Sequence, residues 1–355
     1  MSVFVNVLEE VVVKEVYAQI EELRPDLQPK IRVAEVTAYT LNRLPPLFAT
    51  SMVGWKYQYD YALNTLHPQI VQLVKRGFQL ALYGDPLHDE TPLPHHLFIN
   101  SAGVLYELGK ILGKKYLRWR DVPTLIKELS GRKSSNINYC QMQTVIQEEE
   151  TQIQSASHLS HKQKSLLAAS RRFITKQAEQ KVQDHSYVSS IRGANSWAEE
   201  KKLRDAAEME YHALKSYTLQ AELGMVNVLE HLVFLAIERS TTPEVHRQIN
   251  HGEAAAYILN RLPAMYATSV RGFKYLRQKA ISEFSRELIG ETRNGILKVA
   301  KHSQENEAKI PAYGFIQEYE QSIFQIRDFL GRNDISLQNI VEIVKDLTCF
   351  TALSA

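Results

Sequence analysis

Two short segments of the chain hold the residues whose types and spacing best suit ligand binding. Each has a tyrosine followed by an asparagine and an arginine, in the hexapeptides AYTLNR, ending at Arg43, and AYILNR, ending at Arg261. Arginine can pair with a phosphate or a guanine edge, and its planar face can stack on a base. Asparagine can read a base edge, and a tyrosine three or four residues earlier on a helix lies on the same side. These types of group can bind anions and planar rings.

Hydroxyl and aromatic side chains follow both segments. The pairs Thr50-Ser51 and Thr268-Ser269 stand where a helix is expected to begin, and the free N–H groups at a helix start attract anions. Trp55 and Phe273 come four residues after each serine and can stack on a base. The predicted ligand-binding residues are therefore Tyr39, Asn42, Arg43, Thr50, Ser51, Trp55, Tyr257, Asn260, Arg261, Thr268 and Ser269.

Each candidate also has a purely structural interpretation, which the sequence leaves open. An arginine in the last turn of a helix is stabilised by the helix macrodipole without any ligand. Asn42 can satisfy carbonyl groups left free at the helix end. Tyr39 and Trp55 can pack in a core, and Thr50 and Ser51 can act as ordinary helix caps.

The two segments belong to an internal repeat. Residues 35–51, EVTAYTLNRLPPLFATS, align with residues 253–269, EAAAYILNRLPAMYATS, at an offset of 218, and eleven of the seventeen positions are identical. Upstream, the NVLE sequences at 6–9 and 227–230 match at an offset of 221. The chain therefore contains a duplicated domain.

Hydrophobic periodicity predicts the elements that position these residues. Apolar residues recur at intervals of three and four over residues 3–24, and a shorter helix is expected over 33–44, closed by Pro45-Pro46. A third helix is expected from about residue 53 to 83, with a bend or break at His67-Pro68. The second copy predicts equivalent helices, including one from about 272 to 302. Further helices are expected at 97–113, 122–130, 315–330 and 336–348.

The middle of the chain differs in composition, and it sets the predicted domain boundaries. Residues from about 140 to 222 are rich in Gln, Glu, Lys and Ser, contain no proline and hold no clean heptad. The sequence predicts an all-α protein with a first domain at 1–135, a helical polar spacer at 136–222 and a second domain at 223–355. Sequence similarity between the copies fades after about residue 280.

Composition makes several classes of protein improbable. The 355 residues carry a formal net charge of +2, so no strong field favours nucleic acid or an anionic membrane. The absence of a long apolar run and of a basic leader predicts a cytoplasmic location. Only Cys140 and Cys349 are present, which excludes a disulfide framework or a four-cysteine zinc site. His158 and His161 lack partners in register, so no metal is expected, and no catalytic signature suggests an enzyme.

Basic residues are concentrated between residues 114 and 120. Lys114, Lys115, Arg118 and Arg120 are interleaved with Tyr116 and Trp119. Such a cluster can contact nucleic acid or an acidic partner, but a solvated amphipathic face is the more common explanation. Nucleic-acid binding is not expected.

The repeated motif resembles the late competence development protein ComFB family. The resemblance rests on NVLEE, on EVTAYTLNRLPPLFATS and on the later Asp85-Pro86 and Thr91-Pro92-Leu93. It covers roughly residues 3–95 and 224–280. The second copy lacks the Asp-Pro and Thr-Pro-Leu elements, and its nearest equivalent is the segment 308–311, AKIP. The family's zinc-binding branch uses cysteines that this chain lacks.

The resemblance implies a small helical domain, often dimeric, that acts as a receptor for cyclic di-GMP and in some cases cyclic di-AMP. We therefore expect a non-enzymatic protein, without cofactor, that binds a cyclic dinucleotide and relays the signal to an unknown protein partner. Because such a ligand has two equal halves, the copies are expected to pair as a pseudo-dimer or within a homo-oligomer. The alternative is a structural adaptor in which the repeat is a dimerisation unit without ligand.

Overall fold

The computed structural model describes residues 4–83, 91–131, 197–301 and 309–353, and in these the protein is all-α, as the sequence predicts. Most of the predicted spacer lies outside the described residues, as do Asp85-Pro86 and the His158–His161 pair. The chain divides into two compact units. The first contains residues 1–123 and 213–341, and therefore both repeats. The second contains residues 124–212 and 342–355.

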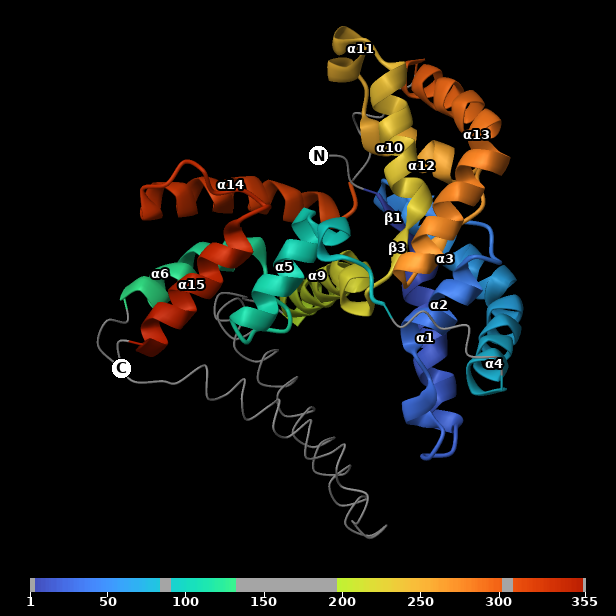
Figure 1. Ribbon diagram of the computed structural model, residues 1–355, viewed down its shortest axis with the longest axis horizontal. Helices are drawn as coiled ribbons and strands as arrows, with labels where there is room; N and C mark the ends of the chain where they lie inside the picture. Colours follow the sequence, from blue (N-terminus) through green and yellow to red (C-terminus); the bar gives the residue numbers. More distant parts are fainter. Residues whose placement is uncertain (1–3, 84–90, 132–196, 302–308, 354–355) are drawn as a thin grey trace. The chain divides into compact units, whose positions relative to one another are not determined.

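Repeat 1 and repeat 2 contain equivalent elements in the same order (Figure 1). Repeat 1 consists of β1 (Val5–Asn6), α1 (Val7–Glu22), the 3-10 turn η1 (Gln28–Lys30), α2 (Val33–Leu41), β2 (Phe48–Ala49), α3 (Met52–Tyr61), the π-helical turn η2 (Ala62–Leu66) and α4 (His67–Tyr83). Repeat 2 consists of β3 (Val226–Asn227), α10 (Val228–Ser240), α11 (Pro243–Gln248), α12 (His251–Leu259), β4 (Tyr266–Ala267) and α13 (Val270–Lys301).

The first helix of each repeat begins later than its apolar pattern predicts. Val5 and Asn6 are taken into a two-residue antiparallel pairing with Ala49 and Phe48. The Asn6 side chain then caps α1, because its Oδ1 accepts a hydrogen bond from the Leu8 N–H at 3.2 Å. Repeat 2 uses its own asparagine, Asn227, in the same way. The short strands therefore tie the start of each repeat to the segment that follows its Asn-Arg motif.

The predicted break near Pro68 is present as a π-helical turn, η2, between α3 and α4. Proline has no N–H and cannot make the hydrogen bond that would continue a regular helix. Repeat 2 has Arg286 at the corresponding position, and α13 runs without interruption. The local sequence thus accounts for the one difference in regularity between these helices.

Each repeat completes the hydrophobic core of the other. The core of repeat 1 is built from α1, α2, η2 and α4, yet it also contains Ala264 and Tyr266 from repeat 2 and Met225, which directly precedes β3. The core of repeat 2 in turn contains Phe48 from repeat 1. Phe48 and Tyr266 occupy equivalent positions, so the exchange is reciprocal. The repeats form an intramolecular pseudo-dimer within the first unit.

The duplication extends past the region of sequence similarity. Repeat 1 continues through η3 (His95–Phe98), α5 (Ser101–Ile111), η4 (Trp119–Asp121) and α6 (Val122–Gly131), and repeat 2 through α14 (Ala312–Leu330) and α15 (Ile340–Leu353). Gly113 and Gly331 end α5 and α14 with φ of 66° and 63°, a conformation that favours glycine. Buried apolar residues also match at the offset of 218, in the pairs Leu105–Ile323, Leu108–Ile326, Leu117–Ile335 and Val122–Ile340.

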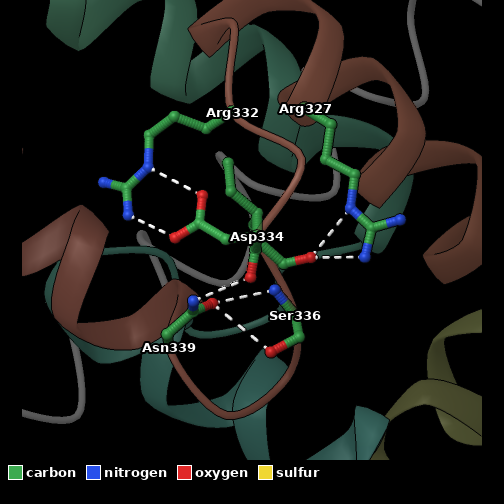
Figure 2. A network of polar contacts seen from close by, with 6 residues as sticks. Arg327, Arg332, Asp334, Ser336 and Asn339 are labelled. Carbon is green, nitrogen blue, oxygen red and sulfur yellow. Dashed lines mark hydrogen bonds and ion pairs between the residues drawn. The ribbon is translucent and has the colours of Figure 1, made fainter.

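A polar network fixes the turn between α14 and α15 (Figure 2). Arg327 donates from Nε and a terminal nitrogen to the Ile335 carbonyl at 2.8 and 2.6 Å. Asn339 accepts from the Ser336 N–H at 2.8 Å and donates to the Asp334 carbonyl at 2.9 Å. These bonds satisfy backbone groups that would otherwise lack partners in the turn. Among the described helices, none combines the length and apolarity needed to cross a membrane.

Candidate functional site

The arginine of each repeated motif lies on the tyrosine four residues before it. The Arg43 guanidinium carbon is 3.6 Å from the Tyr39 ring centroid, and a terminal nitrogen donates to the Tyr39 carbonyl at 2.9 Å. Arg261 stacks on Tyr257 at 3.5 Å with the same bond at 2.9 Å. The helix spacing brings these side chains together, and the free carbonyls of the last turn attract the cation. Both tyrosines are half-buried, and both arginines are exposed.

Small residues let the next long helix pass close to each stack. A Cβ on Gly77 of α4 would stand 3.0 Å from Val36 and 3.4 Å from the Tyr39 ring. A Cβ on Gly295 of α13 would stand 3.0 Å from Ile258 and 3.2 Å from the Tyr257 ring. Glycine at these equivalent positions therefore sets the distance between the helices and holds each tyrosine ring in place.

The electrostatic surroundings of the two arginines differ. Arg261 lies 3.5 Å from a carboxylate oxygen of Glu291, and Lys298 also lies over the Tyr257 ring at 5.2 Å. The equivalent positions in repeat 1 are Leu73 and Leu80. In the described part of the chain, Arg43 makes no ion pair with a carboxylate. Of the two arginines, Arg43 therefore keeps the more available positive charge.

Asn42 and Asn260 join the two repeats to one another. Asn42 donates to the Tyr266 carbonyl at 2.9 Å and accepts from the Tyr266 N–H at 2.5 Å. Asn260 donates to the Phe48 carbonyl at 2.9 Å and accepts from the Phe48 N–H at 2.6 Å. Each amide keeps one N–H and one lone pair beyond these bonds. Their predicted contact with a base edge stays a prediction, and it is limited to those remaining groups.

The predicted helix caps are present. Ser51 accepts from the Gly54 N–H at 3.2 Å, and Ser269 accepts from the Gly272 N–H at 3.1 Å. Thr50 and Thr268, which precede them, are half-buried. The ordinary capping role of the serines is therefore confirmed, and a ligand at these hydroxyls stays a prediction.

Each helix start is also met by a segment of the other repeat. Pro92 pairs with Ser269, and the Val270 N–H donates to the Thr91 carbonyl at 3.2 Å. Lys309 pairs with Ser51. Pro92 and Lys309 stand near equivalent positions, so the crossing is reciprocal. The pairing supports the alignment of the Thr-Pro-Leu segment with residues 308–311.

Trp55 stacks on Tyr59, with ring centroids 4.8 Å apart and ring planes at 15°. Trp55 is half-buried, and Lys14 lies 5.8 Å from the Tyr59 centroid. Its equivalent in repeat 2, Phe273, packs against the core of that repeat. An aromatic pair of this kind is stabilising without a ligand. The predicted contact of Trp55 with a base stays a prediction.

The structure assembles two equivalent composite surfaces from the predicted residues. In each, the Tyr–Arg stack at the end of one repeat's helix lies beside the strand of the other repeat, since α2 contacts β4 and α12 contacts β2. Each strand leads directly into the Thr-Ser cap of its own repeat. One surface therefore contains Tyr39 and Arg43 of repeat 1 beside β4 of repeat 2. The other contains Tyr257 and Arg261 of repeat 2 beside β2 of repeat 1.

A buried polar cluster at the repeat junction was missed by the sequence analysis. Glu9 accepts hydrogen bonds from the Tyr266 hydroxyl at 2.6 Å and from Gln220 at 2.8 Å, and the same Gln220 nitrogen lies 3.3 Å from Glu230. Asn6 donates to the Tyr266 hydroxyl at 2.9 Å. The available signal was the identical glutamate in the two NVLE sequences, placed within an apolar helical stripe.

Burial changes the protonation of this cluster. Loss of hydration raises the pKa of Glu9 to about 7, although the bonds from Tyr266 and Gln220 oppose the change. Burial raises the pKa of Glu230 to about 8, and the neighbouring Glu9 charge adds to this effect. The pKa of Tyr266 is raised well above its usual value by burial and by both carboxyls. The cluster therefore holds protons near neutral pH.

The basic cluster of residues 114–120 is not one continuous basic surface. Trp119 is fully buried, with its Nε1 donating to the Ser101 carbonyl at 3.0 Å. Arg118 is paired with Glu318 of α14. Ser322 of α14 donates to the Trp119 carbonyl at 2.6 Å. This segment therefore joins the C-terminal parts of the two repeats. Among the described residues, no group of three or more His, Cys, Asp or Glu side chains is placed to hold a metal ion.

Comparison with known proteins bears out the resemblance. The family model described as late competence development protein ComFB matches residues 5–82 and again residues 226–303. These two ranges coincide with repeat 1 and repeat 2 up to the ends of α4 and α13. No curated protein and no solved structure matches the chain.

Proposed function

Because the chain carries two tandem domains of the late competence development protein ComFB family, we propose that it is a non-enzymatic signalling protein that binds a cyclic dinucleotide. Cyclic di-GMP is the first candidate and cyclic di-AMP the second, as the family resemblance implies. The observation that supports this proposal is the reciprocal pairing of the repeats, which places two equivalent Tyr–Arg stacks in one compact unit. A ligand with two equal halves suits such a pair.

The two arginines are proposed to contact the phosphates or the guanine edges. Each uses one N–H for the tyrosine carbonyl, so other N–H groups remain for a ligand. Arg43 is proposed to attract an anionic ligand more strongly than Arg261, because Glu291 partly neutralises the Arg261 charge. Repeat 1 is therefore proposed to bind more tightly than repeat 2.

A signal can be relayed through the junction between the repeats. Arg43 directly follows Asn42, which holds the Tyr266 backbone of repeat 2. A ligand that shifts Arg43 therefore acts on the bonds that join the repeats. The altered junction is proposed to be recognised by a protein partner.

A structural adaptor without ligand is the second candidate. The observation that favours it is the use of both motif asparagines in joining the repeats. Under this proposal the motif was retained because it forms the pseudo-dimer. A ligand that binds only the folded protein raises its thermal midpoint, whereas an adaptor without a ligand site shows no such increase.

Titration calorimetry of the full chain with cyclic di-GMP and cyclic di-AMP tests the proposal. We expect binding by the wild-type protein and loss of binding in the Arg43→Ala, Arg261→Ala double variant. Arg286→Ala is the matched control, because Arg286 is exposed on α13 and lies outside the motif. Absence of heat and of thermal stabilisation with both ligands, or unchanged binding by the folded double variant, would overturn the proposal.

A further inference from the structure

Two glutamates from equivalent positions meet inside the pseudo-dimer. Glu9 lies on α1 and is only 5% exposed, whereas Glu230 lies on α10 and is half-buried. Both carboxyls lie within hydrogen-bonding distance of the same Gln220 side-chain nitrogen. Their nearest oxygens therefore stand within about 6 Å of one another. At such a distance two negative charges repel strongly where water is excluded.

The groups around the pair do not supply a compensating positive charge. Tyr266 of β4 faces Glu9, Gln220 of α9 (Trp197–Leu223) faces both carboxyls, and Asn227 lies beside Glu230. The hydroxyl and amides can donate hydrogen bonds but carry no charge. Within the described part of the chain, no Lys, Arg or His is among the groups that shift the pKa of either carboxyl. A proton is therefore the simplest way to neutralise the pair.

We propose that Glu9 and Glu230 form a proton-binding pair that keeps the two repeats joined, and that loss of the proton loosens the junction. This inference concerns regulation by pH and does not depend on the cyclic dinucleotide. With one carboxyl protonated, the pair carries a single charge, shared among the surrounding donors. With both ionised, the repulsion acts directly between α1 of repeat 1 and α10 of repeat 2.

The direction of the pH effect follows from proton linkage. Both carboxyls have a pKa of about 7 or 8 in the folded state, against a reference value of 4.5. Between these values the folded state binds more protons than the unfolded state, so the free energy of unfolding falls as pH rises. The contribution of the pair is most favourable at acidic pH and is lost as pH rises through about 7 and 8.

Tyr266 contacts both Glu9 of the carboxyl pair and the asparagine that joins the repeats. Its hydroxyl donates to Glu9, while its backbone N–H and carbonyl pair with Asn42. Movement at the carboxyls is therefore transmitted to the backbone that Asn42 holds. The Tyr266 N–H is a suitable reporter, because hydrogen exchange at this group requires its bond to Asn42 to open.

The test compares thermal unfolding and hydrogen exchange of the full chain from about pH 5 to about pH 9. In the wild-type protein we expect the thermal midpoint to fall by about 5 °C or more, and exchange in residues 260–270 to rise beyond its ordinary pH dependence. Glu230→Gln, which imitates the protonated acid, should reduce both effects by about half, because burial alone still raises the pKa of Glu9 to about 7. The double variant Glu9→Gln, Glu230→Gln should remove most of both effects. Glu238→Gln is the matched control, an exposed acid on the same helix, and should keep them.

An equal pH dependence in Glu230→Gln and Glu238→Gln would overturn the proposal, as would a wild-type midpoint that does not fall. If Glu230→Gln does not fold, Glu9→Gln and infrared spectroscopy of the wild-type protein decide the question. The carbonyl band of a protonated, buried carboxyl should persist at neutral pH and disappear by about pH 9. Its absence at neutral pH would contradict the proposal.

Discussion

Asn42 bonds through one side chain to both backbone polar groups of Tyr266, a residue 224 positions further along the chain. Asn260 repeats this arrangement with Phe48. A side-chain amide that bonds to both the N–H and the carbonyl of one residue replaces the two bonds that a neighbouring strand would make. Each repeat therefore supplies hydrogen-bond partners to the short strand of the other. The same motif that suggests ligand binding therefore also builds the pseudo-dimer.

Replacing Asn42 with alanine should destabilise the junction. The change leaves the Tyr266 N–H and carbonyl without these partners, which costs about 3 kcal/mol in the free energy of unfolding. Urea denaturation measures this loss. Asn64→Ala serves as a control, because Asn64 is exposed, and its effect should be close to zero. A loss of equal size in both variants would mean that the bonds to Tyr266 contribute nothing specific.

The two glycines beneath the Tyr–Arg stacks should not tolerate a methyl group. Gly295→Ala places a Cβ 3.0 Å from Ile258 and 3.2 Å from Tyr257, so overpacking should cost about 1–3 kcal/mol. Gly290→Ala, on the same helix with no atom within 4 Å of the new Cβ, should stabilise the protein by about 0.5–1 kcal/mol. The thermal midpoint should therefore fall in Gly295→Ala and rise in Gly290→Ala. Stabilisation by Gly295→Ala would show that the helices can separate without loss.

The difference between Arg43 and Arg261 should appear in the affinity for a cyclic dinucleotide. Arg43→Ala should weaken cyclic dinucleotide binding more than Arg261→Ala, because Glu291 already neutralises part of the Arg261 charge. Glu291→Gln should therefore strengthen binding by repeat 2, by about tenfold if about 1.4 kcal/mol is regained. Calorimetric affinity and stoichiometry measure both effects. Equal losses in the two arginine variants would show that Glu291 does not distinguish the repeats.

Tyr266→Phe should both destabilise the protein and shift its pH dependence. The variant removes the hydroxyl that donates to Glu9, at a cost of about 1–3 kcal/mol. That hydrogen bond lowers the pKa of Glu9, so its removal should raise the pKa above the value of about 7. The pH-dependent fall in stability should then extend to a higher pH, because only the folded-state pKa is raised. Thermal unfolding across the pH range measures it, with Tyr83→Phe, an exposed tyrosine of α4, as control.

The sequence was sufficient to predict what depends on local chemistry. Helix periods, the serine caps and the break at Pro68 each follow from interactions within a few residues. The duplication was also visible, because residues 35–51 and 253–269 are so alike. These signals identified the Tyr–Arg geometry correctly, since four residues on a helix fix both side chains on one face.

The remaining features depend on contacts between distant residues and could not be predicted. Nothing near Asn42 indicates that its partner is Tyr266, or that Phe48 enters the core of the other repeat. The similarity between the C-terminal helices of the two repeats was not visible in the sequence, because few residues are identical there. It is preserved in the pattern of buried positions and in the two capping glycines, Gly113 and Gly331. Glu9 and Glu230 are visible in the sequence as the repeated glutamate of NVLE, but their meeting could not be predicted, because Tyr266 and Gln220, which contact Glu9, are more than 200 residues away from it.

The exchange of Phe48 and Tyr266 between the two cores has a consequence for biosynthesis. Repeat 1 leaves the ribosome about 218 residues ahead of the equivalent segment of repeat 2. At roughly 5–20 residues per second this delay is on the order of 10–40 s. During that time the nascent first repeat lacks Met225, Ala264 and Tyr266, which complete its interior. The first half of the polypeptide therefore waits for the second before its own folding can finish.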